Sequence, residues 1–485
     1  MQEKSLQKKV MSGMFWRFGE RICAQLVTFL VSVVLARILD PSHYGVVSLI
    51  TIFITIANVF VTDSFGKALI QKKNADSCDY SSVFYFNILF SWLVYAIIFS
   101  LAPLVARFYK EPILTPTLRV LALKLPLAGV NSVQQAYVSK NMLFKRFFWS
   151  TLIGTIVSGF VGIVMALAGM GVWALVGQYL TNSAMDTIIL WVTVKWRPTK
   201  EWSWDRLKNL LTFGWKILLT SLINSVYDNL RSLIIGKAYS SADLAYYTKG
   251  IHYPNLIITN VNTSISSVLF PAMSTMQDDK NRLKESVRKS ISVSTYIIFP
   301  LMAGLAAIAP NLIAWMLTEK WLPCVPYLRI ACVYLALYPI NITNLQAIMA
   351  IGKSDVYLKL NIIKKVIGII CVVLSLPFGV KIFAASEIIV GITAVTTNIT
   401  ANKKLLGYSG MDLWKDIYKS LAFSLIMAGS ILLLNRYLCV ITSSYILKMF
   451  IEVVAGAIIY IASSYVAKSK EFFYILNVVK KRNKK

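Results

Sequence analysis

Charged residues inside long apolar stretches are the feature of this sequence with the clearest chemical meaning. Arg17, Glu20 and Arg21 lie in the first such stretch, and the two arginines, four residues apart, fall on one face of a helix. A charge near the centre of a spanning helix costs about 2.5–3.5 kcal/mol on insertion scales, so such a residue is a functional candidate. Because arginine contacts phosphate through two parallel N–H groups, the pair predicts a clamp for a phosphate-bearing ligand.

Further basic residues lie at similar depths of later apolar stretches. Lys216 follows Trp215 just as Arg17 follows Trp16, so it occupies the matching place in the second half of the chain. The predicted ligand-binding set is Arg17, Arg21, Lys124, Lys216, Arg231 and Lys364. For the members nearest the helix ends the alternative is snorkelling, in which a long basic side chain reaches the lipid headgroups.

Carboxylates in the same stretches are candidates for a coupling ion or for charge pairing. They are Glu20, Asp63, Asp186, Asp228 and Glu387. A carboxyl group in surroundings of low dielectric constant can exchange a proton in the working pH range. The alternative is a structural pair with a basic neighbour, for which Asp228 and Arg231 have the helical spacing.

Basic residues outnumber acidic ones among these intramembrane candidates. With Arg119, Arg329 and Lys365 added, nine candidates are basic, against four acidic residues deep in their helices. A cavity of that sign suits a diphosphate and repels a cationic drug. Amide side chains are candidates either for hydrogen bonds to a polar ligand or for interhelical hydrogen bonds. They are Gln25, Asn131, Gln135, Asn224, Asn341, Asn344 and Gln346.

The composition indicates which elements must position these residues. Of 485 residues, 57% are hydrophobic and only 15% are charged, with a mean hydropathy of +0.63. Globular proteins are about a quarter charged, so the sequence excludes an ordinary soluble enzyme, a disordered chain and a secreted disulfide scaffold. The apolar residues recur in blocks of about 20 or more, which is the length that spans a bilayer. The predicted fold class is an all-α polytopic membrane protein.

Fourteen membrane-spanning helices are predicted. Their approximate ranges are 11–38, 44–65, 81–108, 114–138, 147–168, 171–194, 210–237, 249–275, 287–317, 323–350, 356–378, 380–401, 417–435 and 445–466. Several prolines fall within these ranges and predict kinks, because neighbouring groups can satisfy the freed backbone. They are Pro103, Pro126, Pro254, Pro271, Pro300 and Pro339.

The distribution of basic residues sets the predicted orientation. With the amino terminus inside, the inner connections and the tail carry 32 Lys and Arg, whereas the outer connections and their flanks carry nine. This asymmetry predicts that both termini are cytoplasmic. The formal charge of +28 is spread between the apolar blocks, so no nucleic-acid partner is expected. The basic, amphipathic tail KSKEFFYILNVVKKRNKK is expected to rest on anionic headgroups.

Several classes of catalytic and metal site are missing from the sequence. No connection exceeds about 20 residues, and the chain lacks paired-carboxylate, GxSxG, GxxxxGK[ST] and HExxH motifs. Six cysteines without CxxC spacing and only two histidines predict neither a disulfide framework nor a metal site. We therefore expect a transporter rather than an enzyme, without a cofactor.

A weak internal repeat divides the predicted helices. The run LARILDPSHYGVVSL (35–49) has a counterpart, IGKAYSSADLAYYTK (235–249), in which a helix also ends on a basic residue and restarts after polar residues. Six helices separate the copies, so they share one orientation and predict two parallel six-helix bundles. The predicted domains are an N-terminal lobe at 1–200, a C-terminal lobe at 201–405, and two added helices with a basic tail at 406–485.

Four segments resemble a known family. They are LARILDPSHYGVVSL, QQAYVSKNMLFKRFF (134–148), GIVMALAGMGVWALVGQYL (162–180) and AIGKSDVYLKLNI (350–362). Across most of residues 10–405 the chain is similar to the polysaccharide transporter branch of the multidrug/oligosaccharidyl-lipid/polysaccharide exporter superfamily. The segment at 134–180 is the most specific part.

This resemblance implies a V-shaped, two-lobed fold in the bacterial inner membrane. It implies that an undecaprenyl-diphosphate-linked oligosaccharide is moved from the inner to the outer leaflet by alternating access. It also implies basic cavity residues on helices 1 and 7, where Arg17, Arg21 and Lys216 lie. The expected partners are this substrate, membrane lipid and polysaccharide polymerase or assembly proteins, and we expect a monomer.

Three other functions are consistent with a polytopic membrane protein. A drug or cation antiporter of the same fold would require acidic cavity groups. A membrane enzyme of polysaccharide assembly, such as a polymerase or acyltransferase, would require longer loops or catalytic histidines. A non-catalytic scaffold would not need the costly intramembrane charges.

The predicted topology can be tested by cysteine labelling. In a background without the six native cysteines, single cysteines at Ser42 and Ser240 should react with an impermeant thiol reagent added from the periplasm. Cysteines at Lys73 and Lys200 should react only after the membrane is opened. Labelling of both sets from one side would contradict the fourteen-helix, parallel-repeat topology.

Overall fold

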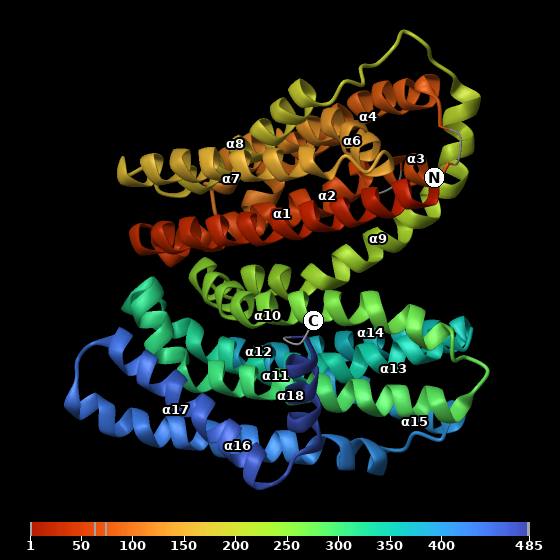
Figure 1. Cartoon of the computed structure of the whole chain (residues 1–485). Helices are drawn as coiled ribbons and strands as arrows, with labels where there is room; N and C mark the ends of the chain where they lie inside the picture. The colour runs from red at the N-terminus through yellow and green to blue at the C-terminus, as the bar shows by residue number, and fades with distance from the viewer. Residues whose placement is uncertain (1, 63–64, 73–74, 483–485) are drawn as a thin grey trace. The chain divides into compact units, whose positions relative to one another are not determined.

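The protein is built from helices. The computed structural model describes residues 2–62, 65–72 and 75–482, and these residues contain no β-strand. In chain order the helices are α1 (Gln2–Ile38), α2 (Pro41–Thr62), α3 (Phe65–Gln71), α4 (Ser77–Tyr109), α5 (Leu114–Leu121), α6 (Lys124–Lys140), α7 (Phe144–Leu167), α8 (Val172–Thr193), α9 (Trp204–Ala238), α10 (Ser241–Ser274), α11 (Lys280–Leu317), η1 (Glu319–Cys324), α12 (Val325–Ala336), α13 (Tyr338–Ala350), α14 (Ser354–Ser375), η2 (Leu376–Phe378), α15 (Val380–Leu406), α16 (Gly410–Ile441), α17 (Tyr445–Val466) and α18 (Lys470–Arg482) (Figure 1).

Each of the fourteen predicted segments is present as a helix or as a pair of helices. The segment predicted at 114–138 is broken into α5 and α6, and the segment predicted at 323–350 is broken into α12 and α13. Within the described residues, ten segments are long and apolar enough to cross a membrane. The predicted all-α polytopic membrane fold is confirmed.

Short polar side chains set the first residue of several helices. The N-cap residues whose side chains accept a hydrogen bond from the first helical turn are Asp76, Ser203, Asp279, Ser409 and Ser444. At α4 and α16 the third helical residue is an aspartate whose carboxylate accepts a hydrogen bond from the backbone N–H of the cap residue. The two reciprocal bonds form a complete capping box. These caps satisfy backbone N–H groups that a helix start otherwise leaves without partners.

The chain divides into two compact units, one ending at Ala245 and one beginning at Tyr246. This boundary differs from the predicted domain limits at 200 and 405. The difference arises because α9 packs on α2, α3 and α4 and so belongs to the first unit. The arrangement as two six-helix repeats stays a prediction.

In the first unit α7 packs against both α1 and α8, and α4 packs on α6. The connection between α8 and α9 is fixed to the start of α4, where Ser81 Oγ lies 3.1 Å from Thr199 Oγ1 and Arg206 forms an ion pair with Asp76. The Arg206 guanidinium lowers the pKa of Asp76 to about 2, so this pair keeps its charges in the physiological pH range. This connection therefore holds α9 beside α4.

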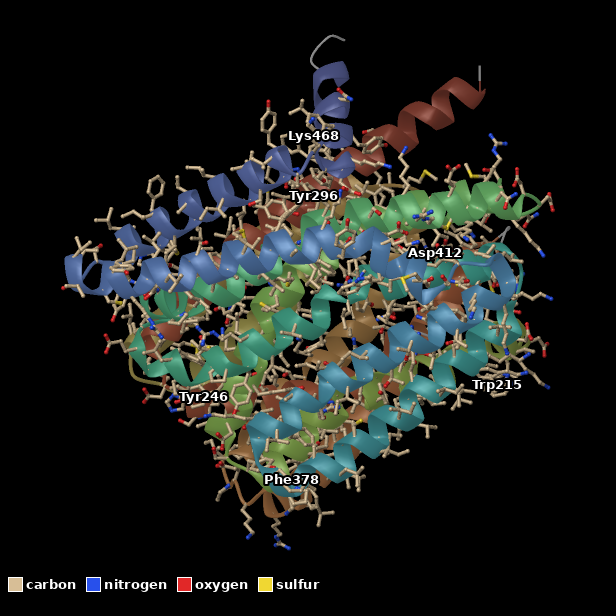
Figure 2. All side chains as sticks on the ribbon, turned by 90° about the horizontal axis from the view of Figure 1, so that it is seen from below. Trp215, Tyr246, Tyr296, Phe378, Asp412 and Lys468 are labelled. Carbon is tan, nitrogen blue, oxygen red and sulfur yellow. The ribbon has the colours of Figure 1, made fainter. Side chains whose placement is uncertain are left out.

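In the second unit α11 is the central helix, because it contacts α12, α13, α16 and α17. One apolar core joins it to α13, α15 and α16, and a smaller core around Tyr296 and Tyr460 joins it to α16 and α17. The Tyr296 hydroxyl donates to Ser464 Oγ at 2.7 Å near the end of α17, and Figure 2 labels Tyr296 and also Lys468, where the chain leaves α17 and enters α18. The two helices added after the predicted lobes are thus attached through α11.

The outer surface of the helices is apolar. Leu89, Phe160, Val192 and Val440 have 74%, 69%, 77% and 88% of their surface exposed. Such exposure of large apolar side chains would be unfavourable in water, and it marks faces that contact lipid chains. The polar groups must then lie between helices or at the helix ends.

The two copies of the predicted repeat meet at small residues. A methyl group on Gly45, in the second turn of α2, would lie 1.7 Å from the carbonyl oxygen of Ser241. Gly236 near the end of α9 similarly packs against Leu49, which is fully buried. The absence of a side chain at Gly45 therefore permits the start of α10 to reach α2.

Replacing Gly45 with alanine should lower the stability of the protein. The added methyl group meets backbone rather than a flexible side chain, so overpacking of about 1–3 kcal/mol is expected. The apparent unfolding temperature in detergent should fall. Gly429→Ala is the matched control, because Gly429 lies inside α16 with open space beside it. Equal unfolding temperatures for both variants would contradict the close approach.

Candidate functional site

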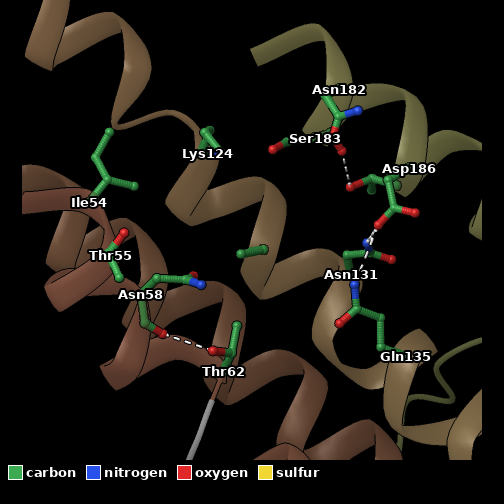
Figure 3. A pocket seen from close by; sticks show the side chains of 12 residues that line it. Ile54, Thr55, Asn58, Thr62, Lys124, Asn131, Gln135, Asn182, Ser183 and Asp186 are labelled. Carbon is green, nitrogen blue, oxygen red and sulfur yellow. Dashed lines mark hydrogen bonds between the residues drawn. The ribbon is translucent and has the colours of Figure 1, made fainter. Parts of the chain in front are cut away.

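Two adjoining polar pockets lie inside the first unit. The first, of about 280 Å³, lies between α2, α6 and α8, and the second, of about 430 Å³, lies between α1, α2, α3, α6, α7 and α8. Both are lined by Asn58, Thr62, Gln135 and Asp186. Figure 3 shows the first pocket, with Lys124 and Asp186 on its wall.

Helical periodicity brings the polar side chains to these pockets. On α2, Thr55, Asn58 and Thr62 recur at intervals of three and four and so share one face. The hydroxyl groups of Thr55 and Thr62 donate to the carbonyl groups four residues earlier, at 2.7 and 3.0 Å. This back-bonding satisfies the hydroxyl hydrogen of a threonine within an apolar helix.

Asp186 connects three helices. Its carboxylate accepts from Asn131 Nδ2 at 2.7 Å and from Gln135 Nε2 at 3.4 Å, both on α6, and from the Ser150 hydroxyl on α7. The Oδ1 atom of Asn131 is buried and has no hydrogen-bond partner among the described residues. A ligand in the pocket that donates a hydrogen bond would satisfy this oxygen.

Arg17 and Glu20 line the second pocket as an ion pair. Arg17 Nη1 lies 3.0 Å from Glu20 Oε2, and Thr151 donates to the other oxygen of this carboxylate at 3.0 Å. The Arg17 side chain is 44% exposed, whereas that of Glu20 is 13% exposed. Arg17 also lies over the Phe147 ring, 4.2 Å from its centre, so aromatic contact and the carboxylate together orient the guanidinium.

Lys124 is placed by the break between α5 and α6. It is the first residue of α6, and its Nζ lies 5.5 Å from the centre of the Tyr179 ring on α8. The N-terminus of a half-helix carries a partial positive charge. Lys124 and this half-helix together make one side of the first pocket electropositive.

The structure thus brings four predicted residues to one place: Arg17, Glu20, Lys124 and Asp186. Arg21 does not line either pocket; its side chain is exposed, with no hydrogen bond or ion pair to another described residue. The expected clamp of Arg17 and Arg21 is therefore not present within these pockets. The two side chains have different surroundings: Arg21 is exposed, whereas Arg17 is paired with Glu20 and lies over the Phe147 ring.

The other predicted residues lie elsewhere. On α9, Lys216 and Asp228 are exposed and Arg231 is buried. Lys364 on α14 and Glu387 on α15 are partly buried in the second unit. Asp63 lies outside the described residues.

The charge of the two pockets also differs from the expectation. Their lining contains two basic side chains, Arg17 and Lys124, and two carboxylates, Glu20 and Asp186. The predicted excess of basic charge is therefore not found in them, because each cation lies in a pocket with a carboxylate. Cationic ligands are not disfavoured here by charge alone.

The sequence analysis missed part of the pocket lining. Thr55, Asn58 and Thr62 were not singled out, although their spacing inside an apolar span was a usable signal. Of the predicted amides, Asn131 and Gln135 line the pockets. Others join helices within the second unit, where Asn398 donates to Asn341 at 3.1 Å and Asn402 to Asn344 at 2.6 Å.

Comparisons of sequence show related proteins along the whole chain. A family model described as polysaccharide biosynthesis protein matches residues 34–326. The chain is 24% identical to a membrane protein of the cps region of Klebsiella pneumoniae, over 96% of both proteins. It is 24% identical to the lipopolysaccharide biosynthesis protein WzxC of Escherichia coli K12, over 86% of both.

Comparisons of structure show the same fold in membrane transporters. The lipid II flippase MurJ in an inward closed conformation superposes with a TM-score of 0.72, at 15% identity, over 93% of this chain and 98% of that one. An inward-facing multidrug resistance transporter of the MATE family gives a TM-score of 0.59, at 15% identity, over 80% of this chain and 96% of that one. These similarities establish the architecture of a multi-pass membrane protein.

The sequence match decides the family. The matched region covers more than half of the chain, and the two relatives named above match 96% and 86% of its length. The two solved structures share the fold of this chain at 15% identity. The chain belongs to the polysaccharide biosynthesis protein family.

Proposed function

We propose that the protein is a flippase that moves a lipid-linked oligosaccharide across the bacterial cytoplasmic membrane by alternating access. The observation that carries this proposal is a pair of polar, charged pockets enclosed by helices whose outer faces are apolar. The fold shared with a lipid II flippase and the family shared with polysaccharide biosynthesis proteins support it. Both termini are proposed to be cytoplasmic.

The chemistry of such a substrate matches the polar pockets and the apolar outer faces of the helices. A diphosphate needs counter-charges and N–H donors when it leaves water, and Arg17 and Lys124 supply them. Sugar hydroxyls need donors and acceptors, which the amides and hydroxyls of α2, α6 and α8 provide. The lipid chain can stay against the apolar outer faces throughout transport. No covalent bond has to be made or broken, so we propose a transporter rather than an enzyme.

The carboxylates give the site a means of release. Uniform binding does not produce transport, because the site must bind the headgroup in one state and lose it in the other. Glu20 is already paired with Arg17 at 3.0 Å, so it competes with a phosphate for the same guanidinium. We propose that protonation or cation binding at Glu20 or Asp186 alters this competition and couples transport to an ion gradient.

The proposal predicts which substitutions abolish export. In a strain that lacks the gene, Lys124→Ala and Arg17→Ala should reduce surface polysaccharide strongly while the protein reaches the membrane at normal levels. Loss of a charge-assisted phosphate contact weakens binding by about 1.5–3 kcal/mol, or roughly ten- to a hundredfold. Arg21→Ala and Lys216→Ala should have smaller effects, because neither residue lines the pockets.

Controls make this result specific. Lys200→Ala, at an exposed position of the connection between α8 and α9, should export normally. Lys124→Arg should retain part of the activity if the charge is what matters. Normal export by Lys124→Ala and Arg17→Ala would remove these pockets as the headgroup site.

A cation antiporter is the second candidate. It is favoured by the two carboxylates in the pockets and by the fold shared with a multidrug resistance transporter. Proteoliposomes distinguish the two functions. A flippase should move a fluorescent lipid-linked sugar from one leaflet to the other, and it should not transport ethidium against an ion gradient. Ethidium transport that is abolished by Asp186→Asn would favour the antiporter.

A further inference from the structure

A proline in α4 leaves one main-chain carbonyl without its helical partner. Pro103 has no N–H, so the carbonyl oxygen of Phe99, four residues earlier, cannot accept the usual bond. Arg119 on α5 replaces this donor: its Nε lies 3.2 Å from the Phe99 oxygen. Its guanidinium carbon also lies 4.1 Å from the centre of the Phe99 ring.

The same arrangement occurs in the second unit. Pro310 in α11 frees the carbonyl oxygen of Ala306, and Arg329 on α12 donates its Nε–H to that oxygen at 3.0 Å. In each unit the proline follows a fully buried alanine, Ala102 or Ala309. In each unit the arginine follows a buried leucine at the start of the broken helix.

A third proline is satisfied in a related way. Pro300, also in α11, frees the carbonyl oxygen of Tyr296, which accepts a hydrogen bond from the Tyr460 hydroxyl of α17 at 2.7 Å. Three prolines within long helices thus have their freed carbonyl bonded by a side chain from another helix. A carbonyl oxygen without a hydrogen-bond donor is unfavourable in an apolar environment. A side chain that donates to this oxygen therefore fixes where the second helix lies.

We propose that Arg119 and Arg329 are positioning residues of a repeated proline latch, defined as the proline, the carbonyl it frees and the arginine that donates to it. Each latch holds a short half-helix against the proline-containing helix that precedes it in the chain. In the first unit this half-helix is α5, which ends just before Lys124. Arg119 therefore acts on the proposed substrate site through Lys124 and not through contact with substrate.

Arginine suits this task better than lysine. The Nε–H group lies in the plane of the guanidinium and points sideways, so it can reach a backbone oxygen while the rest of the group faces the ring or the headgroups. This assignment also explains why two arginines predicted as intramembrane candidates do not line the pockets described above.

A double-mutant cycle tests the latch. Arg119→Ala should lower the apparent unfolding temperature of the purified protein by about 2–4 °C, since the Phe99 carbonyl loses its donor. Pro103→Ala restores a backbone N–H at position 103, so Arg119→Ala in this background should have little effect. The corresponding cycle with Pro310→Ala and Arg329→Ala should behave in the same way.

A second measurement reports on position rather than stability. In a cysteine-free Lys124→Cys protein, Arg119→Ala should change the rate of thiol modification at position 124, and adding Pro103→Ala should restore the original rate. Arg107→Ala is the matched control, because Arg107 is an exposed arginine in the last turn of α4. Its effects should not depend on Pro103. Neither measurement uses transport, so the latch can fail while the proposed function stands.

Each result decides the proposal. The latch would be overturned if Arg119→Ala lowered the apparent unfolding temperature equally with proline or alanine at position 103. It would also be overturned if Arg119→Ala did not lower this temperature in either background. If Arg119→Ala does not accumulate, the double variant Pro103→Ala/Arg119→Ala must accumulate; failure of both would also overturn it. An unchanged labelling rate at position 124 would remove the positioning role.

Discussion

Hydrogen-bond satisfaction in an apolar environment is the constraint on which the rest of this structure depends. Lipid chains supply neither donors nor acceptors, so each polar group inside a spanning helix must find its partner within the protein. The helical backbone does this for nearly every residue. The exceptions are the positions where the sequence interrupts a helix, and there side chains such as Arg119, Arg329 and Tyr460 take over.

The same constraint explains the composition of the pockets in the first unit. Asp186 is surrounded by amide and hydroxyl donors, and Glu20 is paired with a guanidinium and a hydroxyl. A charged group can be kept between apolar helices only with such support, because its desolvation is expensive. Charge neutrality within the pockets is therefore the expected resting condition, and a charged ligand has to exchange partners with groups that are already paired.

Sequence reasoning recovered the helices because their signal is strong and local. Blocks of about 20 apolar residues are set by the thickness of the bilayer, and each predicted block is helical in the structure. The breaks at Leu123 and Leu337 come just before Pro126 and Pro339, where kinks were predicted, but the division of each segment into two helices was not predicted. The packing of α9 on α2, which places α9 in the first unit, is a contact between residues distant in the sequence, and the hydropathy pattern contains no signal for it.

Site residues were harder to predict than helices. A charge in a spanning helix indicates that some partner exists, but not whether this partner is a ligand, a carboxylate or a backbone oxygen. Arg17, Arg119 and Arg231 look alike as sequence, yet one lines a pocket, one bonds a carbonyl and one is buried on α9. The distinguishing information is which residue from another helix lies within hydrogen-bond distance. Only for Arg119 did the sequence contain a clue, in the proline 16 residues earlier.

The three side-chain donors lie at different distances along the chain from the carbonyl groups that they bond, and this has a consequence for assembly during synthesis. Arg119 follows its carbonyl by 20 residues and Arg329 by 23, whereas Tyr460 follows the carbonyl it binds by 164. At a synthesis rate of about 5–20 residues per second, each arginine emerges within a few seconds of its acceptor. Each of these proline-containing helices can therefore pack against its short neighbour as the two leave the translocon. The carbonyl of Tyr296 must instead wait for the penultimate helix of the chain, so its bond forms among the last contacts of the finished protein.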